Sequence, residues 1–91
     1  MKATLVKVLG EHNPRQELFA CDPPMRDYNS REHRYVVASA IVACDTGKPE
    51  TYFFPADKDG KIVGWGELPG SRRGTLDIDV VLGEAGYEVE R

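Results

Sequence analysis

The sequence contains four side chains of the types that bind zinc, and they are widely spread: His12, Cys21, His33 and Cys44. Structural zinc sites take their ligands in close pairs that share a turn. No two of these four residues are near enough in the sequence to do so, and we therefore expect no metal ion. The serines lack a Gly-x-Ser-x-Gly frame, and no glycine-rich phosphate loop joins a strand to a helix. These patterns predict no cofactor and no catalytic residue.

The tripeptide Asp45-Thr46-Gly47 resembles the active-site motif of aspartic proteases, in which two aspartates share one proton. The resemblance includes the apolar run Ile41–Ala43 before it and the segment Val80–Gly83 after it. Lys48-Pro49, however, follows where that family has a small residue. The stretch between the two motifs is also too short for a flap with its supporting strands. The alternative is a surface turn that joins two strands, and we expect the turn.

The segment Asp57–Gly60 resembles part of a calcium-binding loop. An EF-hand loop with Gly60 at its sixth position would begin at Pro55 and end at Gly66, and neither residue supplies the required carboxylate. An Asp-Gly pair between two runs of β-branched and aromatic residues is instead a strong hairpin signal. We therefore expect a hairpin turn at this position.

A mass of 10.1 kDa is enough for one small domain, which we expect to span residues 1–91. The composition is typical of a globular chain and excludes a coiled coil, a transmembrane protein and a disordered tail. The net charge is −3, and residues 75–91 alone carry five acidic side chains and one arginine, a balance of −4. Because phosphate backbones require clustered cations, we expect no direct binding of nucleic acid. An acidic surface is suited to a basic protein partner.

The N-terminal apolar stretch is short and is interrupted by Lys7, so the pattern indicates neither a secretory signal nor a membrane segment. We expect a cytoplasmic protein. Cys21 and Cys44 both lie in apolar runs, and in a cytoplasmic chain we expect two buried thiols rather than a disulfide.

The first half of the chain reads as three strands separated by turn signals. Residues 3–9 and 17–21 are rich in apolar and β-branched side chains, and the second run should stop at Asp22-Pro23-Pro24 because proline lacks the ladder donor. The polar residues 25–34 should form an exposed loop. Residues 35–44 are apolar or small on both alternating faces, which is typical of a central strand covered on both sides. A helix is the competing interpretation, and the adjacent β-branched pairs favour the strand.

The second half predicts a hairpin formed by residues 51–54 and 61–65, then a glycine-rich loop over 66–74. Residues 76–85 should form a helix capped by Thr75 and stopped by Gly86, followed by a short final strand. The fold class is therefore α+β: a small, mostly antiparallel sheet of about five strands with one short C-terminal helix packed on a face.

Binding residues are the remaining candidates for function, because tyrosine, tryptophan and arginine are enriched at binding hot spots. We interpret Trp65 as a core anchor at the end of its strand. The acidic C-terminal region could meet a basic partner surface. The candidate partner-binding residues are Tyr28, Arg31, Arg34, Arg72, Arg73, Asp77, Asp79 and Glu84.

Four segments resemble small proteins carried by bacteriophages and prophages, and together they cover about half of the chain. They are Pro49–Asp57, Trp65–Leu68, Gly70-Ser71 and Ala85–Tyr87. Such proteins include the anti-CRISPR inhibitors, which are similar in size, compact and often acidic. The resemblance implies a non-enzymatic inhibitor that binds a host protein or nucleoprotein complex in the host-cell cytoplasm, and it transfers no functional residue because those families share no motif.

We therefore expect a monomeric or homodimeric binding protein that occupies the surface of a host complex, as an anti-CRISPR protein does. Two alternatives stay open at this point. One is a structural or assembly protein of a phage particle. The other is a dimeric aspartic protease subunit that acts through Asp45-Thr46-Gly47.

Overall fold

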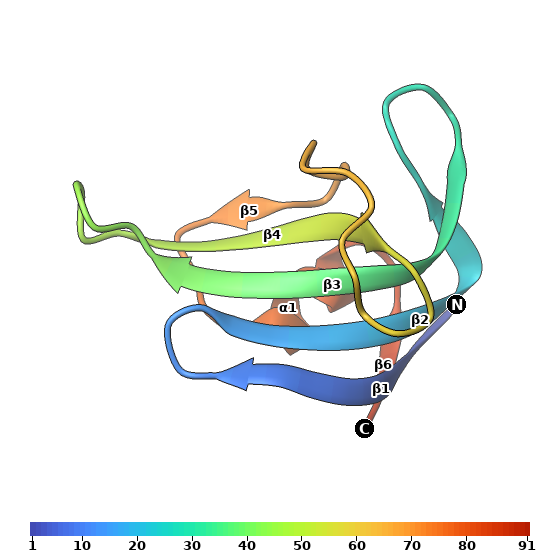
Figure 1. The fold of residues 1–91 in the computed structure, drawn as a ribbon, viewed down its shortest axis with the longest axis horizontal. Coiled ribbons are helices and arrows are strands. Elements are labelled where there is room, and N and C mark those ends of the chain that lie inside the picture. The colour runs from blue at the N-terminus through green and yellow to red at the C-terminus, as the bar shows by residue number, and fades with distance from the viewer.

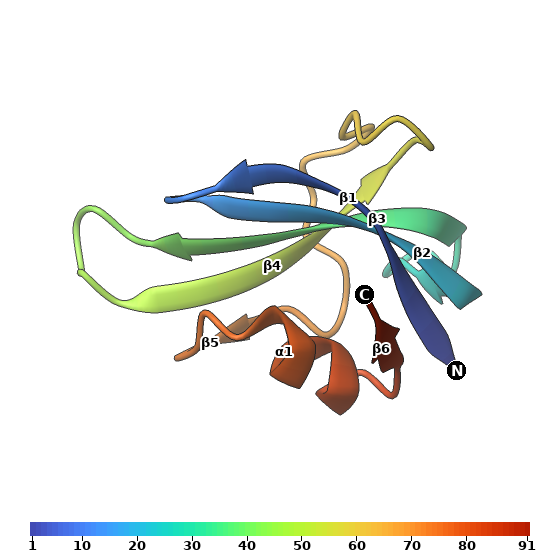
Figure 2. The same ribbon diagram turned by 90° about the horizontal axis from the view of Figure 1, so that it is seen from below.

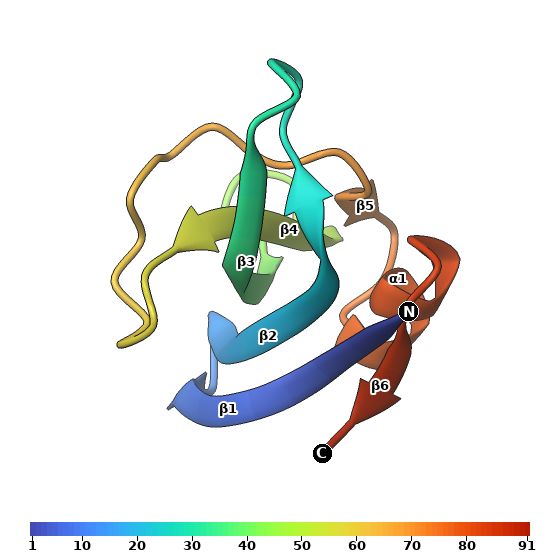
Figure 3. The ribbon, with the colours of Figure 1, turned by 90° about the vertical axis from the view of Figure 1, so that its right-hand side faces the viewer.

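The computed structural model describes every residue from Met1 to Arg91 and contains six strands and one helix. The strands form a single curled sheet in the order β5-β4-β3-β2-β1-β6 (Figure 1; Figure 3). In chain order the elements are β1 (Lys2–Glu11), β2 (Arg15–Arg26), β3 (Glu32–Val42), β4 (Pro49–Ala56), β5 (Arg72–Arg73), α1 (Ile78–Glu84) and β6 (Glu88–Glu90). The α+β class is confirmed, but the sheet is mixed and has six strands rather than about five.

The single parallel pair, β1 with β6, follows from the path of the chain. β5 and β6 lie at opposite edges of the sheet, and α1 crosses one face between them (Figure 2). We call the face covered by α1 the inner face and the opposite one the outer face. No helix of the structure is long and apolar enough to cross a membrane.

β3 confirms the strand predicted for residues 35–44 and lies in the middle of the sheet. Val36, Ala38 and Ala40 are buried on the inner face, and Val37 and Ser39 are buried on the outer face. Coverage on both sides explains why this strand lacks the polar alternation of a half-exposed strand.

β2 is longer than predicted, because Pro23 and Pro24 do not end it. Its ladder with β3 is interrupted between Ala20 and Met25 and then resumes. Proline removes a backbone donor from the ladder. The pairing with β3 can nevertheless resume after the two prolines, because the next residue, Met25, is buried in the core. Met25 is 5% exposed in the core, so the loop predicted over 25–34 is in fact limited to residues 27–31.

The predicted turn at Asp57–Gly60 is present, but the strand predicted after it is not. The Asp57 carboxylate accepts the backbone N–H groups of Asp59 and Lys61, both at 2.9 Å, and Gly60 has a φ of 92°. Only a single bridge, between Ala56 and Ile62, continues the hairpin. The chain then leaves the ladder and crosses the outer face of the sheet (Figure 1).

Helix α1 begins two residues later than predicted. Asp77 is its N-cap and accepts the Val80 N–H at 3.2 Å, while Thr75 accepts the N–H of Asp77 at 3.0 Å. Gly86, with a φ of 97°, follows its end as expected. A seven-residue helix is not stable by itself, so its buried side must hold it in place.

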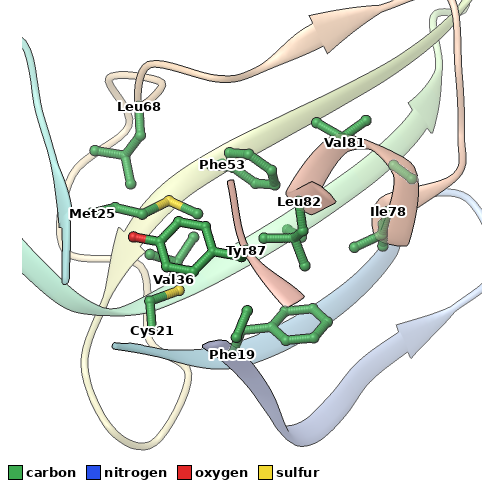
Figure 4. Close-up of a cluster of buried hydrophobic side chains, with 13 residues drawn as sticks. Phe19, Cys21, Met25, Val36, Phe53, Leu68, Ile78, Val81, Leu82 and Tyr87 are labelled. Atoms are coloured by element: carbon green, nitrogen blue, oxygen red, sulfur yellow. The ribbon is translucent and has the colours of Figure 1, made fainter. Parts of the chain in front are cut away.

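The core lies between α1 and the inner face of the sheet (Figure 4). Leu82 from the helix packs with Phe19 of β2 and Phe53 of β4, and all three are fully buried. Tyr87 closes the end of the cluster, and its hydroxyl donates to the Pro23 carbonyl at 2.6 Å. Each large apolar side chain buried in this way contributes about 1.5–3 kcal/mol.

Candidate functional site

The outer face of β4 carries an exposed aromatic cluster. Alternation along the strand places Thr51 and Phe53 on the inner face and Tyr52 and Phe54 on the outer face. The rings of Tyr52 and Phe54 have centroids 6.1 Å apart, and Trp65 meets Phe54 edge-on at 5.6 Å. Trp65 is 75% exposed, so its interpretation as a core anchor is wrong. The outer face has no helix over it, and Trp65 therefore lies on the cluster at the surface.

An arginine already occupies one end of this aromatic cluster. The guanidinium carbon of Arg73 lies 5.7 Å from the centre of the Tyr52 ring, and its Nε lies 2.8 Å from a Glu50 carboxylate oxygen. Tyr52 donates its hydroxyl proton to Glu50 at 2.8 Å, which raises the pKa of the phenol. An aromatic face and a carboxylate together hold the guanidinium.

Glu67 lies beside the cluster, and one of its oxygens lacks a hydrogen-bond partner. Its Oε2 atom is buried and has no hydrogen-bond donor within reach. Glu67 lines a hollow of about 240 Å³ together with Tyr52, Phe54, Trp65 and Arg73. A buried polar atom without a partner is uncommon in folded proteins and calls for an explanation.

The loop between β2 and β3 forms a second wall beside Glu67. Asp27 and His33 are joined by a 2.9 Å hydrogen bond, which, with the backbone N–H groups of Arg31 and Asn29, lowers the pKa of the Asp27 carboxyl. Tyr28 at the loop tip is 75% exposed. A hollow of about 390 Å³ lies between this loop and the segment 63–68.

Three hollows adjoin along this side of the molecule. Glu67 lines both the hollow beside the β2–β3 loop and the aromatic one, while Tyr52 and Arg73 line both the aromatic hollow and a third of about 650 Å³ beside the β3–β4 turn. We call this continuous surface the outer strip. Its centre consists of Tyr52, Phe54, Trp65, Glu67 and Arg73.

The outer strip carries more negative than positive side chains. Its carboxylates are Asp27, Asp45, Glu50 and Glu67, and its cations are Arg31, Lys48 and Arg73. Four acids against three bases do not form the cationic groove that follows a phosphate backbone.

Three of the predicted binding residues, Tyr28, Arg31 and Arg73, lie along the outer strip. Arg34 is exposed on β3 and lines none of its hollows. Arg72, next to Arg73 on β5, forms an ion pair with Glu84 of the helix instead.

The remaining predicted acidic residues have internal roles. Asp77 caps α1, Asp79 forms an ion pair with Arg91, and Glu84 pairs with Arg72. Asp79 and Glu84 are therefore held in ion pairs, in which each stays about half exposed, and Asp77 accepts a backbone N–H of the helix.

The residues that sequence reasoning missed are Tyr52, Phe54 and Glu67. The alternation of residues 50–54 already placed two aromatic rings on one face of a strand. A single helix can cover only one face of a sheet, so the signal was present. The sequence pattern did not predict the path of segment 57–68, which brings Glu67 beside the rings.

The motifs considered for chemistry occupy ordinary structural positions. Asp45-Thr46-Gly47 forms the exposed turn between β3 and β4, where the Asp45 side chain accepts the Thr46 N–H at 2.9 Å. Cys21 is buried, which raises the pKa of its thiol to about 11, but Cys44 is exposed, so the expectation of two buried thiols is half wrong. No group of three or more His, Cys, Asp or Glu side chains is placed to hold a metal ion.

No protein-family model matches the chain, and no curated protein or solved structure shows significant similarity to it.

Proposed function

We propose that this protein is a non-enzymatic binding protein whose outer strip contacts a protein partner that presents basic side chains. The observation that carries the proposal is the exposed Trp65, which lines the same hollow as the rings of Tyr52 and Phe54 and the carboxylate of Glu67. Large aromatic side chains are enriched at binding hot spots. A negative charge next to them favours a positive partner.

The charge balance of the outer strip supports a protein partner rather than a nucleic acid. The strip has four carboxylates and three cations, and one of these cations, Arg73, is already paired with Glu50. It therefore lacks the clustered free cations that a phosphate backbone requires. A protein surface has no such requirement, and a basic one would be met by the carboxylates of the strip.

The resemblance to phage-encoded proteins adds a specific form of the proposal. The chain would act in the host cytoplasm by occupying a Lys/Arg-rich surface of a host complex, such as the channel in which an RNA-guided nuclease holds nucleic acid. The acidic side chains of α1 were the first candidates for such a contact. Since Asp77, Asp79 and Glu84 have partners within the fold, the outer strip is the better-suited surface.

The experiment is a selection of binders from a random-peptide library displayed against the immobilised protein. We expect enriched peptides to contain arginine or lysine, and we expect Phe54→Ala and Trp65→Ala each to weaken their binding at least tenfold, about 1.4 kcal/mol. Val80→Ala is the matched control, because Val80 is 46% exposed on the helix and lies outside the strip.

Two results would overturn the proposal. One is the enrichment of acidic peptides. The other is undiminished binding of the selected peptides to both aromatic variants. Circular dichroism of each variant shows whether a loss of binding reflects the surface or the fold.

A further inference from the structure

On the inner face of the sheet, the carboxylates of Glu17 and Asp79 hold a guanidinium between them. The occupant is the side chain of Arg91, whose Nη1 and Nη2 atoms lie 2.7 and 2.8 Å from the two Glu17 oxygens. Its Nε donates to the Asp79 carboxylate at 3.1 Å, and its guanidinium carbon lies 5.8 Å from the centre of the Phe19 ring. All three nitrogens of the guanidinium are therefore bound to carboxylates beside an aromatic ring.

This site can be reached from solvent along the path that the Arg91 side chain itself takes. Glu17 is fully buried, but the Arg91 side chain that covers it is 38% exposed, and the Asp79 side chain is 49% exposed. The strand that precedes Arg91, β6, lies at the edge of the sheet and pairs with β1 through only three residues. Withdrawal of Arg91 would thus uncover the Glu17 carboxylate without opening the middle of the sheet.

The charges that remain around the site without Arg91 select a cation. Glu17 and Asp79 are two acids, and the one other base in contact with them, Arg15, reaches only the Oε2 atom of Glu17, at 3.0 Å. The other oxygen, Oε1, has no donor besides Arg91. An anion would be repelled, and a neutral apolar group would leave Oε1 without a hydrogen bond.

The geometry of the site selects a guanidinium among cations. The contacts to Glu17 and Asp79 come from three different nitrogen atoms of one planar group. An ammonium has a single nitrogen atom and cannot reproduce these contacts, whereas a guanidinium can donate to both carboxylates while it lies beside an aromatic ring. The occupant must therefore be an arginine rather than a lysine.

We infer that Glu17, Asp79 and the Phe19 ring form an arginine-binding site that Arg91 keeps closed, and that an arginine side chain of another protein enters it when Arg91 is withdrawn. The site lies on the face opposite the outer strip, so the inference goes beyond the proposed function and does not depend on it. Because Arg91 belongs to the same chain, its effective concentration at the site exceeds that of a dilute external arginine.

The test is a titration of the Arg91→Ala variant with the Nα-acetyl amides of arginine, lysine and citrulline. Citrulline has nearly the shape of arginine but carries no charge. We expect the arginine compound to raise the Tm of the variant in a saturable manner, because a ligand that binds only the folded state stabilises it. We expect the lysine compound to bind at least tenfold more weakly and the citrulline compound to have no saturable effect.

Further variants assign the contact to the Glu17 carboxylate. Adding Glu17→Gln to Arg91→Ala removes the charge, and we expect it to weaken the binding of the arginine compound at least tenfold. Arg26→Ala is the matched control, because Arg26 is an exposed arginine whose partner, Glu32, is exposed as well. We expect neither this control nor the wild type to respond to the arginine compound. Sucrose, which favours the folded state, is added equally to all samples if Arg91→Ala is unfolded in buffer.

Two results would overturn the inference. One is the absence of a saturable, arginine-specific response in Arg91→Ala, which is also the result expected if Arg15 moves into the vacated place. The other is equally tight binding of the arginine compound to the variants with and without Glu17→Gln.

Discussion

At the scale of single residues, the main charge interaction is the buried carboxylate of Glu17. Its side chain is fully buried on the inner face, and the C-terminal Arg91 donates to both of its oxygens at 2.7 and 2.8 Å. Arg15 adds a third hydrogen bond at 3.0 Å, and the Arg91 guanidinium also lies 5.8 Å from the centre of the Phe19 ring. A buried carboxylate is tolerated only when its charge and its oxygens are satisfied in this way.

The first prediction concerns Arg91. We expect Arg91→Ala to lower the free energy of unfolding by about 2–3 kcal/mol in urea denaturation, because it leaves Glu17 buried with one partner. The loss stays below that of a fully enclosed pair, since Arg15 remains and the Arg91 side chain is 38% exposed. Adding Glu17→Gln to this variant should recover part of the stability, because burying a neutral amide without the Arg91 partner costs less free energy than burying a charged carboxylate without it. No recovery in the double variant would contradict the role given to the charge.

The pH dependence of stability provides a second readout of the same contact. The hydrogen bonds from Arg91 lower the pKa of Glu17 in the folded state, below about 4.3 for an unfolded glutamate. Such a group stabilises the fold above the unfolded pKa, and the contribution is lost as the pH falls through the folded pKa. Acidification from about pH 6 to 3 should therefore destabilise the wild type more than Arg91→Ala. If the free energy of unfolding falls equally with pH in the two proteins, Arg91 does not lower the pKa of Glu17 in the folded state.

At the scale of elements, the turn Asp57–Gly60 is both locally determined and docked on the outer face. The Asp57 side chain ties the turn together, and the backbone N–H of Asp57 donates to the Lys61 carbonyl at 2.9 Å. Gly60 lies so close to β1 that an added Cβ would be 2.9 Å from a Leu9 methyl carbon. This contact holds the beginning of the segment that carries Trp65 and Glu67.

The second prediction compares two glycines with positive φ. Gly47→Ala should cost about 1 kcal/mol, because its φ of 67° is unfavourable for alanine but the space around it is open. Gly60→Ala should cost about 1 kcal/mol more, because the Leu9 side chain must also move. Urea denaturation of both variants measures the difference. Equal losses would mean that the turn does not pack firmly on β1.

At the scale of the whole molecule, one edge of the sheet is open. β6 pairs with β1 only at residues 2–4, so the rest of β1 has no neighbour on that side. Two register shifts, between Leu5 and Lys7 and between Val8 and Gly10, disturb this edge. Bulges and a lysine on an edge strand are features that oppose pairing with another chain.

The third prediction follows for the oligomeric state. We expect the protein to sediment as a monomer, and we expect Lys7→Val to increase self-association by removing the charge from an edge that already exposes Val6 and Val8. Lys58→Val is the matched control, because Lys58 is an exposed lysine in the turn after β4. Sedimentation velocity over a range of concentrations measures both. A wild-type dimer, or equal behaviour of the two variants, would contradict this account of the edge.

The sequence by itself determined the local elements. The β-branched run of β3, the Asp57–Gly60 turn and the glycine after α1 were predictable because each depends on the preferences of neighbouring residues. The alternation of β4 likewise determined that Tyr52 and Phe54 share a face.

Only the tertiary structure decided which face is covered and which residues distant in sequence meet. Whether β2 ends at its prolines depends on the buried Met25 beyond them, and the parallel pairing of β6 depends on the route of α1 across the sheet. Trp65 is exposed because that route leaves the outer face of the sheet without a helix, and Glu67 reaches the aromatic cluster because segment 57–68 returns along it. These outcomes depend on burial and chain path, which no local pattern of residues contains.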